Sequence, residues 1–279
     1  MINSDLLLNK GIDMDRKKAL IIYLIGSLGQ IFSVCIMVWL LRGIKVEMGY
    51  SSVAGFVAIA IGGISSAIWG TVISNKYKNK SIKNILYDFF NINQSIKEYL
   101  LLLTFITLDF MYIVLGGELN ISNWYIPVVL FVKAILFGGI EEIGWRYTFQ
   151  PILEEKLNYI LATLVTFICW GIWHLAFFYI DGTLAVLSST EMIHFYIGLL
   201  INCFILSAIM RRTNSLWLCV MGHSLINVLS QLAVGGNQIV AYVCQVMIVI
   251  VAIVISMGAS KNILKGAGKP NFNLLVKGR

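Results

Sequence analysis

The run EEIGWR at 141–146 holds two adjacent carboxylates followed by an arginine. On a helix, Glu142 and Arg146 lie one turn apart with the acid nearer the N-terminus, so the arginine can neutralise that acid. Glu141 lies about 100° further round the helix and has no local partner. A carboxylate that is shielded from water and unpaired can take up a proton. The spacing therefore predicts Glu141 as a general base supported by Glu142 and Arg146; an ordinary charged helix end is the alternative.

A second segment places an imidazole where it could meet this base. Trp170 and His174 lie one turn apart. The chain turns near Asn158, and Glu141 and His174 lie at similar sequence distances on either side of that turn. An antiparallel helical hairpin would therefore bring them to a similar depth, although Pro151 can kink the first arm. The alternative is a histidine that only packs in the interior.

A third segment carries two hydrogen-bonding side chains on one helix face, because His223 and Asn227 are also one turn apart. Such a pair could donate to the negative charge that develops when water attacks a carbonyl group. Histidine and asparagine also form hydrogen bonds between membrane helices, which is the alternative reading.

The elements that must position these groups are membrane helices. Hydrophobic residues make up 58% of the 279 residues and charged residues 13%, whereas a soluble domain carries about 25% charged residues. The alternating pattern of a membrane barrel is absent, so the sequence predicts an all-α, multi-pass bundle of about eight transmembrane helices in the cell membrane. The predicted spans are 19–41, 53–73, 99–117, 124–140, 160–180, 192–210, 213–234 and 239–257.

The distribution of charge predicts the orientation. Of the 21 Lys and Arg residues, all but Arg42, Lys45 and Lys133 fall outside the spans on one side of the predicted topology. The positive-inside rule then places both termini in the cytoplasm. The net charge of +7 therefore reflects the membrane topology and does not indicate binding to nucleic acid. The basic residues are expected to contact anionic lipid. The five cysteines all lie within predicted spans and form no disulfide or zinc pattern.

The order of the three motifs resembles that of the CPBP family, which includes CAAX prenyl endopeptidases and bacteriocin-processing enzymes. The family's first motif, Glu-Glu-x-x-x-Arg, is matched by Glu141, Glu142 and Arg146. Its second motif, Phe-x-x-x-His, is matched at Trp170 and His174, with tryptophan replacing phenylalanine and keeping the aromatic character.

The family's last motif, His-x-x-x-Asn or Asp, is matched by His223 and Asn227, so the resemblance covers roughly 124–234. It implies an intramembrane protease that hydrolyses a peptide bond in a membrane-associated peptide, either a prenylated peptide or one of the bacteriocin or signal type. By this resemblance Glu141 and His174 activate water, while His223 and Asn227 stabilise the oxyanion.

Three regions follow from these predictions. Residues 1–123 would hold the first three spans, residues 124–234 the catalytic core, and residues 235–279 the last span and a basic cytoplasmic tail. Within the first region, apolar residues recur at helical spacing over 81–98. They indicate an amphipathic helix on the cytoplasmic leaflet, with a plain loop as the alternative.

Metal dependence and function class stay open at this point. Glu141, His174 and His223 could hold zinc with water as the fourth ligand, but a metal-free glutamate base fits the same residues. A non-catalytic immunity or binding protein and a small proton-coupled transporter are the competing functions. Of the remaining ionisable groups, Asp109 is expected to contact another helix and His194 to lie at a membrane interface.

Overall fold

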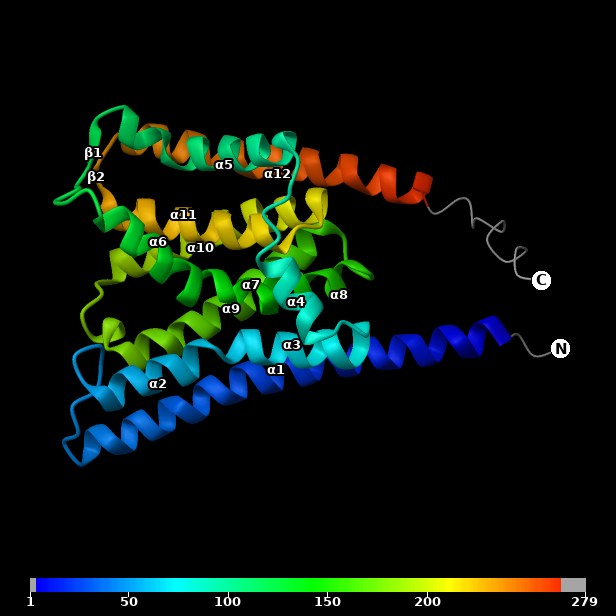
Figure 1. The fold of residues 1–279 in the computed structure, drawn as a ribbon, viewed down its shortest axis with the longest axis horizontal. Helices are drawn as coiled ribbons and strands as arrows, with labels where there is room; N and C mark the ends of the chain where they lie inside the picture. Colours follow the sequence, from blue (N-terminus) through cyan, green and yellow to red (C-terminus); the bar gives the residue numbers. More distant parts are fainter. Residues whose placement is uncertain (1–3, 267–279) are drawn as a thin grey trace.

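The computed structural model describes residues 4–266, and they form a bundle of helices (Figure 1). The predicted all-α class is confirmed, apart from one two-stranded ribbon. The long helices are α1 Ser4–Gly43, α2 Val53–Gly63, α3 Ser65–Lys78, α5 Ile96–Val114, α6 Ile126–Phe137, α9 Tyr159–Asp181, α10 Ser189–Thr213, α11 Leu216–Leu232 and α12 Gln238–Gly266. From residue 267 onward, the predicted basic tail lies outside the described residues.

Several helices begin where the sequence offers a capping side chain. Ser52, Asn158 and Ser215 each accept a hydrogen bond from a backbone N–H in the first turn of α2, α9 and α11. Ser188 does the same for α10, where Glu191 completes a capping box. Such caps satisfy backbone donors that have no partner within the helix.

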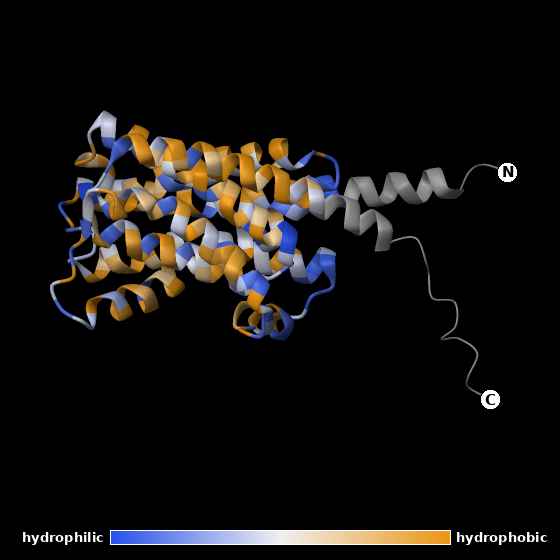
Figure 2. Ribbon diagram, turned by 90° about the horizontal axis from the view of Figure 1, so that it is seen from above, coloured by the Kyte–Doolittle hydropathy of each residue, from blue (hydrophilic) through white to orange (hydrophobic). Residues whose placement is uncertain are grey.

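Five helical stretches of the described chain are long and apolar enough to cross a membrane, which makes this a multi-pass membrane protein. They are Arg16–Gly43, Val53–Lys78, Tyr159–Asp181, Ser189–Thr213 and Gln238–Gly258. The predicted span 99–117 is the helix α5, which carries Lys97, Glu98 and Asp109, and the predicted span 213–234 is the shorter α11. Apolar residues make up much of the helices, and hydrophilic residues are frequent in the loops at both ends (Figure 2).

The predicted fourth span, 124–140, is not one regular helix. α6 stops at Phe137, where two glycines follow, and glycine lowers helix stability. The chain continues through a 3₁₀ turn η1 Gly139–Glu141, a short α7 Glu142–Gly144, a π-helical turn η2 Trp145–Phe149 and α8 Gln150–Glu154. This irregular arm carries the first motif into the centre of the bundle.

Pro151 explains part of this irregularity. Proline has no N–H to donate to the carbonyl of Tyr147 four residues earlier, and the π-helical turn lies at that place. Lys78 of α3 compensates, because its Nζ donates to the carbonyl oxygens of Tyr147 at 3.2 Å and Thr148 at 3.4 Å. A π-helical turn therefore lies just before Pro151, and a kink of the arm stays a prediction.

The irregular arm lies between two apolar cores. Its Ile143 and Tyr147 belong to the core formed with α5, α10 and α11. Its Trp145 and Phe149 belong to the core formed with α1, α3 and α9. The polar residues of the arm are consequently enclosed by packed side chains on both sides.

A short antiparallel ribbon joins two helix ends and was not predicted. β1 Gly117–Leu119 follows α5 and pairs with β2 Ala233–Gly235, which follows α11, so that Gly117 lies opposite Gly235. Gly116 has φ +116°, a conformation that favours glycine, and it ends α5 before the ribbon. The predicted spans 99–117 and 213–234 therefore extend slightly too far.

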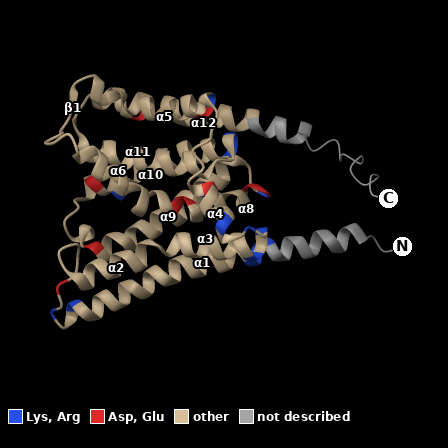
Figure 3. Ribbon diagram, viewed as in Figure 1, with Lys and Arg blue, Asp and Glu red and all other residues tan. Residues whose placement is uncertain are grey.

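The opposite end of the bundle carries most of the positive charge (Figure 3). There, Arg16 of α1 pairs with Glu155 at 2.6 Å, and Arg211 of α10 pairs with Glu154. The start of α1 and the end of α12 both lie at this basic end (Figure 1).

The segment 81–98 contains an eight-residue helix, α4 Ile82–Phe89. Its Ile85 and Phe89 are buried in a core, whereas Ile82 and Leu86 are exposed. Its contact with the membrane surface stays a prediction.

Candidate functional site

The carboxyl group of Glu141 is buried at the centre of the bundle and is 5% exposed. Its Oε2 accepts a hydrogen bond from the indole Nε1 of Trp170, on α9, at 2.7 Å. Sequence reasoning placed His174 level with Glu141, but the direct partner lies one turn earlier on α9. Trp170 stands where the Phe-x-x-x-His motif has phenylalanine, and its indole forms a hydrogen bond that phenylalanine cannot form.

Trp170 contacts four polar groups of the site. Besides its bond to Glu141, its ring packs beneath the guanidinium of Arg146, whose Cζ lies 4.0 Å from the ring centroid. Its centroid lies 5.2 Å from the ring of His174 and 5.4 Å from that of His223. An indole that touches all four groups fixes their relative positions.

Glu142 lies beneath the site as an acceptor for two partners. Arg146 Nη1 lies 3.3 Å from its Oε1, which confirms the predicted pair one turn apart, and both side chains are fully buried. His223 Nδ1 forms a hydrogen bond with the same oxygen at 2.8 Å. Sequence reasoning did not predict this second contact, because it joins residues on separate helices.

A cavity of about 420 Å³ brings the predicted site residues together. Glu141, Trp170, His174, His223 and Asn227 all line it. His174 is ringed by aromatic side chains, with the rings of Trp173 and Phe195 each 5.1 Å away, and its Nδ1 makes no hydrogen bond to a described residue. The three motifs thus form one site from the irregular arm, α9 and α11.

Gly138 allows α6 to approach α11 closely. A Cβ atom at this position would lie 2.4 Å from Nδ2 of Asn227 and 3.1 Å from Nε2 of His223. Both nitrogens therefore face the backbone of Gly138, directly beside the Glu141 turn.

We expect Gly138→Ala to lower the rate of peptide cleavage by about a hundredfold, because displacing catalytic groups by about 1 Å has effects of that size. The measurement is kcat in proteoliposomes. Gly29→Ala is the matched control, since a Cβ at Gly29 has no neighbour within 4 Å. An unchanged kcat for Gly138→Ala would show that peptide cleavage does not depend on the close approach of α6 to α11.

Replacing Trp170 with phenylalanine keeps the aromatic ring and removes its hydrogen bond to Glu141. We expect kcat to fall about tenfold to a hundredfold, because a hydrogen bond to a charged group contributes about 1.5–3 kcal/mol. Trp173→Phe is the control: Trp173 also lies on α9 and donates to Ser65 at 2.8 Å, away from Glu141. Equal losses in the two variants would mean that only packing is affected.

The site residues proposed for zinc do not form a metal-binding group. Among the side chains that the structure describes, no three His, Cys, Asp or Glu side chains are placed to hold a metal ion. The mechanism proposed below uses side chains and water.

Several residues that sequence reasoning set aside also line the cavity. Lys133 and His194 do so, as do Tyr50 and Asn202, which belong to no motif. The Lys133 Nζ lies 5.5 Å from the centroid of the Tyr50 ring. Burial, together with the nearby carboxylate of Asp181, raises the pKa of Tyr50, so its hydroxyl remains a proton donor.

A comparison with known protein families agrees with the family resemblance that the three motifs indicate. Residues 123–229 match the family model described as Type II CAAX prenyl endopeptidase Rce1-like. This confirms the resemblance to the CPBP family, and the matched segment contains all the residues of the three motifs. No curated protein matches the chain.

Proposed function

We propose, because residues 123–229 match the family model described as Type II CAAX prenyl endopeptidase Rce1-like, that this protein is an intramembrane endopeptidase. Its substrate is a hydrophobic or lipidated peptide or protein that reaches the cavity from the membrane. The observation that carries the proposal is the shared cavity, in which a buried carboxylate, two imidazoles and an amide face the same space.

In this proposal Glu141 is the base. Burial and the single hydrogen bond from Trp170 leave the other carboxylate oxygen to accept a proton from water. His174 binds and orients the same water molecule. The water oxygen then bonds to the peptide carbonyl carbon, and Glu141 passes the proton to the departing amine as the C–N bond breaks.

His223 and Asn227 stabilise the oxyanion that forms during this step. The Nδ1 of His223 is bound to Glu142, so Nε2 faces the cavity and donates there when the ring carries both protons. The side chain of Asn227 makes no hydrogen bond to a described residue, which leaves its N–H groups available to the oxyanion. Preorganised donors of this kind stabilise the transition state more than the substrate.

Arg146 and Glu142 support these groups without touching the substrate. Arg146 balances the charge of Glu142 and packs on Trp170, and Glu142 holds His223.

We further propose that the protein lies in the cell membrane with both termini in the cytoplasm, because its positive charge gathers at the end where α1 begins and α12 ends.

The proposal is tested by comparing peptides from membranes that contain the protein with peptides from membranes that lack it, in water enriched in ¹⁸O. A protease yields new peptide termini whose carboxyl groups carry the label, and these appear only when the protein is present. An immunity protein or a transporter yields none, and a complete absence of labelled termini would contradict the proposal.

A further inference from the structure

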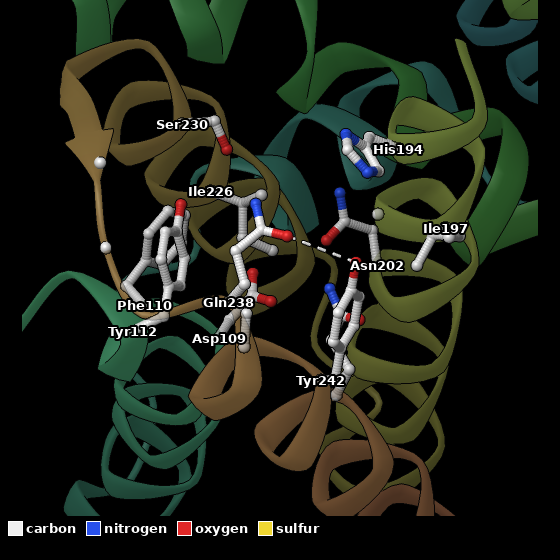
Figure 4. Close-up of a pocket in the computed structure, with 15 residues that line it drawn as sticks. Asp109, Phe110, Tyr112, His194, Ile197, Asn202, Ile226, Ser230, Gln238 and Tyr242 are labelled. Atoms are coloured by element: carbon white, nitrogen blue, oxygen red, sulfur yellow. Dashed lines mark hydrogen bonds between the residues drawn. The ribbon is translucent and has the colours of Figure 1, made fainter. Parts of the chain in front are cut away.

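A second cavity, of about 270 Å³, lies next to the candidate active site at the ribbon end of the bundle. Its walls come from α5, α10, α11 and α12, and Figure 4 shows Asp109 and Gln238 on one side of it and Asn202 and His194 on the other. The polar residues that line it are Asp109, Tyr112, His194, Asn202, Ser230, Gln238, Tyr242 and Gln245.

The two cavities are neighbours, because they share part of their lining. His194, Gly198, Asn202, Ile226 and Ser230 border both of them. A peptide held at Glu141 in the first cavity would therefore lie next to the second. An extended chain advances about 3.3 Å per residue, so a residue close to the cleaved bond is the one that could reach the second cavity.

The second cavity carries a single formal negative charge. Asp109 is its one acidic lining residue, and none of the lining residues is Lys or Arg. The carboxylate of Asp109 forms no hydrogen bond or ion pair with the part of the chain that the structure describes. The amide oxygens of Asn202, Gln238 and Gln245 are further acceptors around it, and Gln238 already accepts a hydrogen bond from Tyr242 at 3.4 Å. Asp109 was expected to contact another helix, but it faces this cavity instead.

We propose that the second cavity is a recognition site for a cationic side chain, lysine or arginine, of the peptide substrate, with Asp109 as its counter-ion. The proposal rests on the proposed protease function, because the cationic side chain belongs to the peptide that is cleaved. The size of the cavity and its single carboxylate favour an organic cation, since a bound metal ion needs several oxygen ligands in contact.

The test uses leucine-rich peptides that carry one lysine, norleucine or glutamate at each position in turn. Their affinity is measured for purified protein in which Glu141→Gln prevents cleavage. We expect lysine at one or two positions to tighten binding about tenfold over norleucine, since the ion pair is shielded from bulk water. Adding Asp109→Asn removes this preference, Asp109→Glu keeps it, and Asp109→Lys moves it to glutamate.

Glu118→Gln is the matched control, because Glu118 is an exposed carboxylate on β1 at the same end of the bundle and lines neither cavity. It leaves the lysine preference unchanged. Equal affinities for all three peptides in the Asp109-containing protein would overturn the cation site, as would a lysine preference that survives Asp109→Asn. If wild type binds lysine peptides preferentially but cleaves none of them, the cation site stands and the protease proposal fails.

Discussion

Replacing Glu141 with glutamine is expected to lower kcat for peptide cleavage by about 10²–10⁴-fold, the range that general-base catalysis supplies. Glutamine keeps the size of the side chain and can still accept the hydrogen bond from Trp170, but it cannot take a proton from water. The value of KM should change little, because a group that acts mainly in the transition state contributes little to substrate binding. The measurement is steady-state kinetics in proteoliposomes with a peptide found in the ¹⁸O comparison.

The control for this variant is Glu118→Gln, which removes an exposed carboxylate that does not line the cavity. It should retain the wild-type kcat. A Glu141→Gln protein that cleaves at the wild-type rate, at equal amounts of folded protein, would remove Glu141 from the mechanism.

Replacing Arg146 with methionine is expected to lower the free energy of unfolding by about 3–5 kcal/mol, since it leaves a buried charge without its partner. Glu142 is fully buried, and its charge is balanced within the core by Arg146. The loss of packing on Trp170 adds to the effect. The measurement is denaturant-induced unfolding in mixed micelles.

A double variant separates charge from packing. Adding Glu142→Gln to Arg146→Met removes both charges, so part of the lost stability should return. Arg212→Met, at an exposed position of α10, is the control and should change stability by less than about 0.5 kcal/mol. If the double variant is less stable than Arg146→Met alone, the buried charge of Glu142 is not what destabilises the single variant.

Local spacing predicted the contacts that lie within one helical turn. Glu142 and Arg146 pair as expected, because a separation of four residues puts two side chains on one face even where the helix is irregular. Counting residues from the turn at Asn158 brought Glu141 near α9 but missed its partner by one turn. The 3₁₀ and π-helical turns of the arm change the rise per residue, and sequence alone does not locate such turns.

Contacts between segments that are distant in the sequence could not be predicted from the sequence. The bond between Glu142 and His223 joins two helices, and its register depends on how those helices pack. The ribbon between Gly117 and Gly235 has the same origin, because two three-residue strands leave no periodic pattern. That Asp109 lines a cavity was not predicted, because a cavity is a property of packing and not of one segment.

The most direct test of the central claim is a single turnover in ¹⁸O-enriched water, with protein in excess over peptide. If Glu141 activates water that attacks the peptide carbonyl, the new carboxyl terminus of the product carries ¹⁸O after this first turnover. The contrary result is an unlabelled product together with ¹⁸O in the carboxylate of Glu141. It would mean that Glu141 attacks the substrate itself and would contradict its role as a base.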